Sequence, residues 1–280
     1  MSFRVCDIIS AIDNFANDPK NQGGHNSIGY SKYYCPDNNC DTDVKKIIST
    51  FIFLVTLFNG IDHNEKLESD KIAEYAILWL SYKLNQKTQN GTTKLYDFYT
   101  EHINTNSKYN EHITNGFKIN KSVIENKIKS MNMNIKDISN FYDPFKSLCN
   151  MYIEVDASNR CMTCLKNAGA FFENCEKLKN TLDITKESSY SQLWHSLSND
   201  YDKFKDKYNS VKCSNVSSLV ACPRSPVTKN ILITIAIIFV TASILLEFSY
   251  KHSLFGFRRK VQKNLRKKLK SLRRKWIISI

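Results

Sequence analysis

Two cysteines separated by two residues, Cys161 and Cys164, have the spacing that comes closest to a reactive site. A C-x-x-C pair serves as a redox dithiol at the start of a helix in a βαβ unit, and it supplies half of a zinc site when a second pair or spaced histidines accompany it. Neither companion is present in the sequence, and the pair stands instead at the beginning of an apolar stripe with helical spacing. We therefore expect a structural role for it and not a redox enzyme.

No other motif predicts catalysis. The sequence contains no Gly-rich phosphate loop, no G-x-S-x-G nucleophile and no H-E-x-x-H zinc motif. His195 follows Trp194 in a helical pattern, so we expect it at the surface or at the core edge rather than as a general base. The histidines show no metal-ligand spacing. We expect no catalytic residue, no metal and no cofactor.

The cysteines predict disulfide bonds in an oxidising compartment, because all nine precede residue 223 and none lies in the C-terminal tail. An odd number leaves at least one thiol free or paired between chains. The alternative is a set of reduced, buried cysteines in a cytosolic domain. Sequence does not choose the connectivity, and Cys213–Cys222 is the bridge most worth testing. The candidate disulfide cysteines are Cys6, Cys35, Cys40, Cys149, Cys161, Cys164, Cys175, Cys213 and Cys222.

An uncharged apolar run, Ile231–Leu246, comes before a tail with no acidic residue. Extended to residues 230–250, the run is long enough to cross a bilayer core of roughly 30 Å. The chain carries 40 Lys and Arg against 27 Asp and Glu, and 12 of the basic residues follow Glu247. The basic charge is therefore local, and it does not indicate nucleic-acid binding. The sequence predicts one transmembrane helix, although a buried helix of a soluble domain is the alternative.

The basic tail sets the expected orientation. Positively charged flanks stay in the cytosol, so residues 251–280 are expected there and the N-terminal region on the opposite face. The opposite, tail-anchored arrangement would require moving the positive charges across the bilayer. No apolar signal segment surrounds Ile8, so the late span is expected to direct insertion.

Apolar residues recur at helical spacing inside the tail, from Phe257 to Trp276. A basic amphipathic helix of this kind binds anionic lipid or lies in a partner's groove. We therefore expect anionic lipid or cytoskeleton as its partner, with a plain stop-transfer anchor as the alternative. The basic residues are Arg258, Arg259, Lys260, Lys263, Arg266, Lys267, Lys268, Lys270, Arg273, Arg274 and Lys275.

The region before the span is predicted to be all-α, because apolar residues recur every three or four positions and no stretch alternates at period two. The run Ile47–Phe58 is too short to cross a membrane and predicts a buried helix, with Thr42 or a neighbouring Asp as its cap and Gly60 at its end. The other stripes are Ile72, Tyr75, Ala76 and Trp79; Leu95, Phe98, Tyr99 and His102; Ile138, Phe141, Phe145, Leu148 and Tyr152; Cys161, Leu165, Ala168, Phe172 and Cys175; and Leu193, Leu197, Tyr201, Phe204 and Tyr208.

These patterns divide the chain into four parts. Residues 1–209 are expected to form a helical, extracytosolic domain, and residues 210–229, with Pro223 and Pro226, a stalk. Residues 230–250 form the predicted transmembrane helix and residues 251–280 the basic cytosolic tail.

Several stretches, in this order and spacing, resemble the Plasmodium interspersed repeat (PIR) family, which includes the Yir, Bir and Cir variant antigens. They are residues 34–40 (YCPDNNC), 76–84 (AILWLSYKL), 141–142 (FY), 145–152 (FKSLCNMY), 161–165 (CMTCL), 197–201 (LSNDY) and 253–258 (SLFGFR).

The resemblance implies a helical domain, one C-terminal span and a variant antigen exported in the infected host cell, with an unidentified host ligand and no catalysis. The sequence shows no Arg-x-Leu-x-Glu/Gln/Asp export signal. The first functional hypothesis is a displayed module for host interaction or immune evasion. The second is an internal membrane organiser whose basic tail binds anionic lipid or host cytoskeleton.

Overall fold

The computed structural model describes residues 1–17, 33–62, 67–87, 93–158, 160–181, 189–216 and 218–222, which belong to one compact unit, Met1–Cys222. Helices dominate these residues, and their only β structure is three isolated bridges, which confirms the all-α prediction. The elements are α1 (Phe3–Asn17), η1 (Pro36–Asn38), α4 (Asp43–Asn59), α5 (Ser69–Lys87), α6 (Leu95–Tyr99), the π-helical η3 (Thr100–Asn104), α7 (Ser107–Asn110), α8 (Lys121–Met131), α9 (Ile135–Ser139), α10 (Tyr142–Asp156), α11 (Ala168–Thr181) and α12 (Ser189–Val211).

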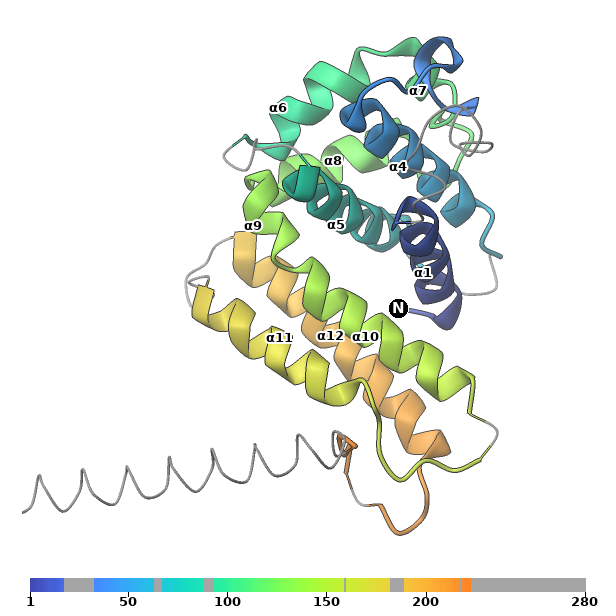
Figure 1. Cartoon of the computed structure of the whole chain (residues 1–280), viewed down its shortest axis with the longest axis vertical. Helices are drawn as coiled ribbons and strands as arrows, with labels where there is room; N and C mark the ends of the chain where they lie inside the picture. Colours follow the sequence, from blue (N-terminus) through green and yellow to red (C-terminus); the bar gives the residue numbers. More distant parts are fainter. Residues whose placement is uncertain are drawn as a thin grey trace, which may run out of the picture. The chain divides into compact units, whose positions relative to one another are not determined.

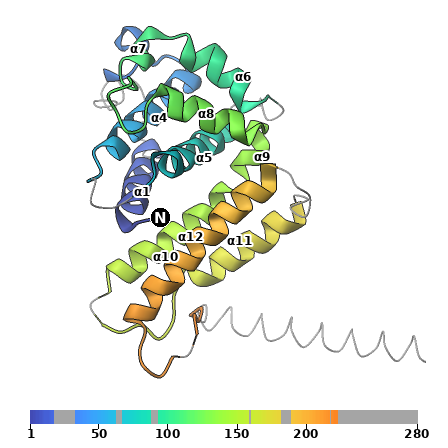
Figure 2. The same ribbon diagram turned by 180° about the vertical axis from the view of Figure 1, so that it is seen from behind.

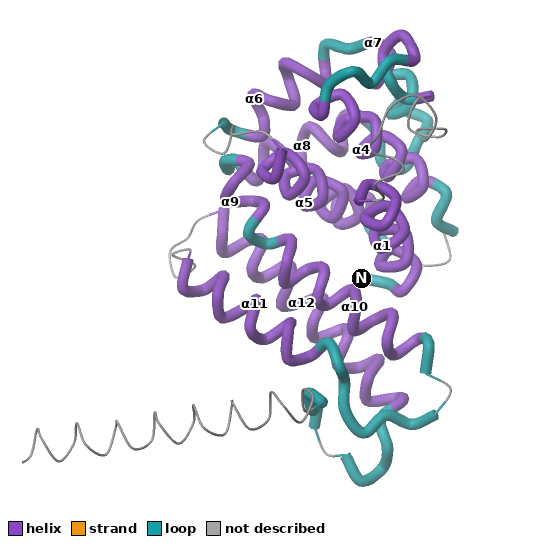
Figure 3. Tube along the Cα trace, in the orientation of Figure 1, coloured by secondary structure: helices purple, strands orange, loops and turns teal. Residues whose placement is uncertain are grey.

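The helices form two groups that share one hydrophobic core (Figures 1 and 2). In one group α10, α11 and α12 lie side by side, with α10 contacting both of the others. In the other group α5 contacts α4, α8 and α9, and α1 contacts both α4 and α10. Figure 3 shows that the longest loops of the second half gather at one end of the α10–α12 group.

The predicted helix at residues 47–58 is confirmed as α4. The Thr42 hydroxyl caps it by accepting a hydrogen bond from the Lys45 amide at 3.2 Å, and the helix ends at Asn59 before Gly60. Phe51 and Phe58 are fully buried, as expected for a central helix.

Helix α5 carries the stripe that begins at Ile72, and it is buried on more than one face. Trp79 and Tyr75 are among the largest fully buried side chains. Glu74, Ser81 and Lys83 are buried as well, because neighbouring helices pack around this element. The burial of charged residues in α5 requires partners, which form the polar clusters described below.

Two stripes differ from the sequence prediction. The stripe from Ile138 to Tyr152 is divided between α9 and α10, and Pro144 lies in the first turn of α10, where a missing amide hydrogen costs little. The helix predicted from the stripe Cys161 to Cys175 is wrong in its first half, since α11 begins only at Ala168. Cys161–Leu165 is extended because its backbone pairs with residues 211–213 and 220–222.

Two of the longer helices were not predicted from the sequence, although both show helical periodicity. Helix α1 buries Val5, Ile9 and Ile12, and α8 buries Ile124 and Ile128. Each helix has polar residues on its remaining faces, so only a short apolar stripe marks it in the sequence.

Candidate functional site

Eight of the nine cysteines form four disulfide bonds, which confirms the expectation of a disulfide-bonded domain. The pairs are Cys6–Cys149, Cys35–Cys40, Cys161–Cys213 and Cys164–Cys222. Cys175 on α11 is unpaired and buried. Burial raises the pKa of its thiol to about 11, so the group is protonated at neutral pH.

The suggested bridge Cys213–Cys222 is wrong. Both cysteines bond instead to the C-x-x-C pair, Cys213 to Cys161 and Cys222 to Cys164. The two sulfurs of the C-x-x-C pair therefore belong to separate bridges. A redox dithiol needs its two cysteines to bond to each other, so this pair acts as a structural connection.

We call the arrangement of these two bridges the exit clamp, because it holds the last described residues against the loop before α11. Two parallel backbone bridges, Met162 with Lys212 and Leu165 with Ala221, accompany the disulfides. The amide of Leu165 donates to the Val220 carbonyl at 2.8 Å, and the amide of Cys222 donates back to the Leu165 carbonyl at 2.9 Å. The compact unit thus extends to Cys222, beyond the residue 209 at which the sequence placed the domain end.

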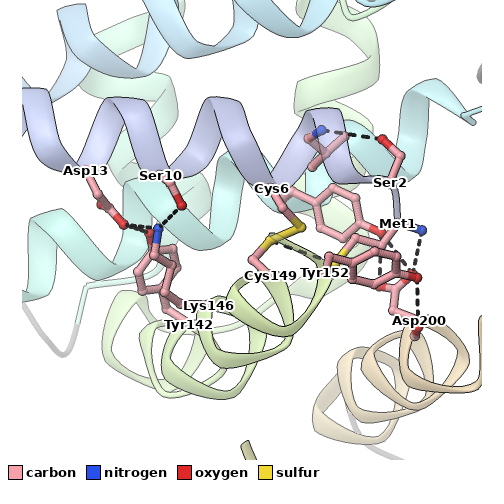
Figure 4. Close-up of a disulfide and its surroundings, with 12 residues drawn as sticks. Met1, Ser2, Cys6, Ser10, Asp13, Tyr142, Lys146, Cys149, Tyr152 and Asp200 are labelled. Carbon is pink, nitrogen blue, oxygen red and sulfur yellow. Dashed lines mark hydrogen bonds and ion pairs between the residues drawn. A yellow bond between two sulfur atoms is a disulfide. The ribbon is translucent and has the colours of Figure 1, made fainter. Parts of the chain in front are cut away.

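The Cys6–Cys149 bond joins α1 to α10, and polar clusters lie near both ends of α1 (Figure 4). At one end the Asp13 carboxylate accepts hydrogen bonds from the Tyr142 hydroxyl at 2.6 Å and the Trp79 indole at 3.1 Å. Lys83 and Lys146 form ion pairs with it at 3.3 and 3.1 Å. Burial alone would raise the pKa of Asp13, but the Tyr142 hydrogen bond and the two lysine charges outweigh burial and lower it.

At the other end of α1, Asp200 of α12 is 1% exposed and lies among three donors. One of them, the Met1 amine, is seen beside it in Figure 4. The Tyr75 hydroxyl donates to both carboxylate oxygens, at 2.9 and 3.0 Å. The ammonium groups of Lys71 and Met1 pair with the carboxylate at 2.8 and 3.1 Å. Burial and the Asp200 charge raise the pKa of Tyr75 well above its usual value, so this phenol stays a donor.

A pocket of about 430 Å³ opens beside Asp200, between α5, α8 and α12. Lys127 of α8 contacts Asp70 and lies 3.4 Å from Glu74. Burial lowers the pKa of Lys127, but the hydrogen bonds and charges of the two carboxylates outweigh burial and raise it. Opposite charges therefore neutralise one another along the lining, and the pocket has the size and polarity to hold a small polar molecule.

Ser196 in this pocket contacts both Lys71 and Glu74, an arrangement that invites comparison with a nucleophilic serine. Lys71 forms ion pairs with Glu74 at 3.0 Å and with Asp200 at 2.8 Å, so its side chain links α5 to α12. Glu74 also pairs with Lys127 at 3.4 Å, which links α5 to α8. His195 is exposed at the rim of the pocket. These contacts describe a polar network that joins helices, and no catalytic step is assigned to it.

No group of His, Cys, Asp and Glu side chains that could hold a metal ion occurs in the residues that the structure describes. None of the helices within those residues is both long and apolar enough to cross a bilayer. The apolar run 231–246 and all the basic tail residues, Arg258 to Lys275, lie outside the described part.

Sequence reasoning missed Asp13, Asp200 and the charged residues of the pocket. Apart from the Lys71–Glu74 pair within α5, their partners lie on other parts of the chain, so no local motif marks these residues. One signal was available: Asp200 follows Leu193 and Leu197 at a helical spacing that places it on the apolar face of α12. A carboxylate on such a face predicts a buried partner.

Two comparisons with known proteins bear on this domain. Residues 6–251 match the family model of the Plasmodium variant antigen protein Cir/Yir/Bir, a match that continues past the apolar run. A solved structure described as the ectodomain of a Plasmodium PIR protein is similar, with 38% sequence identity and a TM-score of 0.60. That match covers 79% of this chain and 98% of the other chain. A search of the curated proteins finds no significant match.

The family match spans most of the chain, and the order of the sequence stretches agrees with it. The structural match includes nearly the whole of the solved ectodomain, so the similarity lies in the disulfide-bonded helical domain of this chain. This chain belongs to the Plasmodium Cir/Yir/Bir family of variant antigens.

Proposed function

We propose that this variant antigen is a single-pass membrane protein, with residues 230–250 as the span, the helical domain outside the cytosol and residues 251–280 inside it. The observation that carries the proposal is that the disulfides and the basic residues of the tail lie on opposite sides of the apolar run. Four disulfides lie before residue 223, and the apolar run and acid-free basic tail follow. Disulfides persist in an oxidising compartment, whereas basic flanks favour the cytosolic face.

We further propose that the protein is exported in the infected host cell and displays the domain for host interaction or immune evasion. Membership of a variant antigen family supports display. A solved ectodomain of a PIR protein, similar over most of its length, supports an extracytosolic location for the domain. The proposed ligand is a host protein, and the function requires no catalysis.

Protease treatment of intact infected cells tests the topology. An epitope tag at the tail and an antibody against the helical domain report the two sides separately. We expect protease to remove the domain signal while the tail tag survives, and both to be lost after the membranes are opened. A domain that resists protease until the cell is opened would exclude display on the cell surface.

The amphipathic spacing of the tail favours a second function, an internal membrane organiser that binds anionic lipid or host cytoskeleton. Deleting residues 257–276 should then lower retention on anionic vesicles or cytoskeletal fractions. A matched control replaces Leu265, Leu269 and Leu272 by Ser, which keeps every positive charge. Loss of retention in the control as well would show that retention depends on the apolar face of the amphipathic helix. Unchanged retention after the deletion would exclude the membrane-organiser function.

A further inference from the structure

The two segments that the exit clamp joins carry positive charge and no acidic residue. Residues 157–167 contain Arg160 and Lys166, and residues 211–222 contain Lys212. Over the whole compact unit, by contrast, acidic and basic residues are equally numerous. The two disulfides and the two parallel bridges hold the segments together, so the charges of both gather at one end of the α10–α12 group (Figure 3).

Three side chains of these segments form what we call the exit face: Arg160, Lys166 and Val220. Arg160 and Lys166 are exposed, and neither forms an ion pair with another described residue. Val220 is 43% exposed although it is apolar. A surface that combines basic and apolar side chains matches the headgroup region of a bilayer, where phosphate groups lie beside the first carbons of the lipid chains.

The carboxylates that precede the exit face in the sequence are engaged inside the domain. Glu154 accepts hydrogen bonds from the backbone amides of Lys166 and Asn167, at 2.6 and 3.1 Å. Asp156 pairs with Lys207 at 3.1 Å. Both charges are therefore compensated, and the positive charge of the exit face dominates its surroundings.

The length of the chain keeps the exit face near the membrane, an argument that rests on the proposed span. The clamp fixes Cys222 to the domain, and only nine residue steps separate it from Ile231, where the apolar run begins. A fully extended chain covers at most about 32 Å in nine steps. Residues 223–230 add Arg224 and Lys229 and no Asp or Glu, so this connection repels no phosphate group either.

We propose that the exit face docks on anionic phospholipid in the leaflet next to the domain. The Arg160 guanidinium can donate two parallel hydrogen bonds to one phosphate, and the Lys166 ammonium acts as a point charge. Each basic residue close to an anionic surface strengthens binding about fivefold. The anchor makes docking intramolecular, so a weak contact is enough to orient the domain.

Docking determines which part of the domain faces away from the membrane. The α6–α7 region lies at the end of the compact unit opposite to the exit clamp (Figures 1 and 2). With the exit face on the lipid, this region is presented to other molecules, whereas the clamp and its loops are covered.

The first experiment uses the full chain in vesicles of phosphatidylcholine with a minority of phosphatidylglycerol. A membrane-impermeant acylating reagent modifies the lysines of outward-facing domains, and mass spectrometry gives the rates at Lys166 and at Lys136, an exposed lysine of α9. We expect Lys166 to react several-fold more slowly in vesicles than in neutral maltoside micelles, and Lys136 to react equally in both. An unchanged rate at Lys166 would overturn the proposal.

Salt separates an electrostatic contact from simple obstruction by the bilayer. At 1 M salt the Debye length falls to about 3 Å, so Lys166 should regain its rate in micelles while the protein stays in the membrane. Slow modification that persists at this salt concentration would overturn the role assigned to the phosphate groups.

The second experiment places a fluorescent probe on the exit face. Val220→Trp adds an indole, which brominated phospholipids quench on contact, and the parent chain corrects for the native tryptophans. Adding Arg160→Gln/Lys166→Gln should reduce the quenching several-fold. The control Arg4→Gln/Lys136→Gln removes the same charge from exposed residues of α1 and α9 and should leave the quenching unchanged. Equal quenching in the two combinations would overturn the proposal.

Alkaline carbonate extraction of the same vesicles reports the anchor separately. Retention of the protein without slower modification of Lys166 would contradict docking and leave the anchor supported. Slower modification in a protein that carbonate then extracts would contradict the anchor and leave the lipid contact supported. The lysine measurement uses the native chain, so it gives a result even where a variant fails to fold.

Discussion

Two buried carboxylates, Asp13 and Asp200, connect helices that are far apart in the sequence. Asp13 of α1 joins Trp79 of α5 and Tyr142 of α10, and Asp200 of α12 joins Tyr75 of α5. Each carboxylate has aromatic donors and ammonium groups around it, so its charge is compensated inside the core. These contacts fix the positions of helices that apolar packing alone leaves free to slide.

Asp200→Asn should destabilise the domain strongly. The substitution leaves Lys71 and the Met1 ammonium facing a neutral amide, and breaking a buried pair costs about 3 kcal/mol. The free energy of unfolding of the 1–222 domain in urea measures the loss. Asp202→Asn, two residues later, removes an exposed pair with Lys205 and should cost well under 1 kcal/mol. Equal losses in both variants would contradict the role of Asp200.

Asp13 should make the domain sensitive to acid. Its pKa is lowered in the folded state, so the stabilisation is fully present above the unfolded value of about 3.9 and is lost as pH falls through the folded pKa. Unfolding free energies measured between about pH 2 and 6 should fall less steeply in Asp13→Asn than in the native domain. Asp41→Asn is the control: the Lys45 hydrogen bond lowers the pKa of this carboxyl as well, but the group is fully exposed and screened by solvent, so the slope should change much less than in Asp13→Asn. A native slope in Asp13→Asn would refute this prediction.

Cys175 should react slowly with thiol reagents in the folded domain. Burial raises the pKa of its thiol to about 11, so the reactive thiolate is scarce at pH 8. We expect labelling roughly a hundredfold slower than in urea, where the thiol has its ordinary pKa. Stopped-flow absorbance with an aromatic disulfide reagent gives both rates, and mass spectrometry verifies the labelled residue. Fast labelling before unfolding would show that the α11 environment opens.

At the scale of elements, the spacing of apolar residues correctly predicted the helices that pack one face on the core. It gave the wrong structure where bonds to distant residues determine the backbone conformation. The stripes of α4 and α12 were predicted because their apolar residues repeat over several turns. Residues 161–165 have the same local pattern but are extended, since two disulfides and two backbone bridges hold them against residues 211–222. No local signal reports partners that lie about fifty residues away in the sequence.

Helix α8 should depend on its cap. The Asn120 side chain accepts a hydrogen bond from the Val123 amide at 3.1 Å, and the helix ends at Asn132 in a left-handed conformation with φ of 43°. Asn120→Ala should lower the unfolding free energy by about 1 kcal/mol. Asn120→Asp keeps an acceptor and should remain near the native value. If urea denaturation shows equal losses for both substitutions, the cap is not the cause.

At the scale of the whole molecule, the Cys6–Cys149 bond should contribute most to stability. It joins residues 143 positions apart, whereas Cys35–Cys40 joins residues 5 apart. A bond that closes a long loop removes more entropy from the unfolded chain. Cys6→Ser/Cys149→Ser should therefore cost about 2–5 kcal/mol in urea unfolding. The control Cys35→Ser/Cys40→Ser should cost less, and the reverse order would refute the entropic account.

The sequence predicted which kinds of residue form the candidate site, but it did not predict which of them contact one another. Cysteine content indicated a disulfide-bonded domain, but the pairing of Cys161 and Cys164 with separate partners depends on how the α10–α12 group packs. The apolar run and the basic tail are strong local patterns, and they remain predictions because they lie outside the described residues. The place of Asp200 on the apolar face of α12 indicates a buried partner, but a single sequence cannot show which distant residues supply it.

The difference in span between Cys6–Cys149 and Cys35–Cys40 also bears on the order in which the bonds form once the chain reaches an oxidising compartment. A loop of 5 positions closes by chain diffusion more readily than one of 143 positions, so we expect Cys35–Cys40 to form first. Cys35 and Cys40 are also the thiols nearest to Cys6 in the sequence, and each could bond to it in place of Cys149. Early closure of the short bridge therefore removes two competitors and leaves Cys6 available for its distant partner.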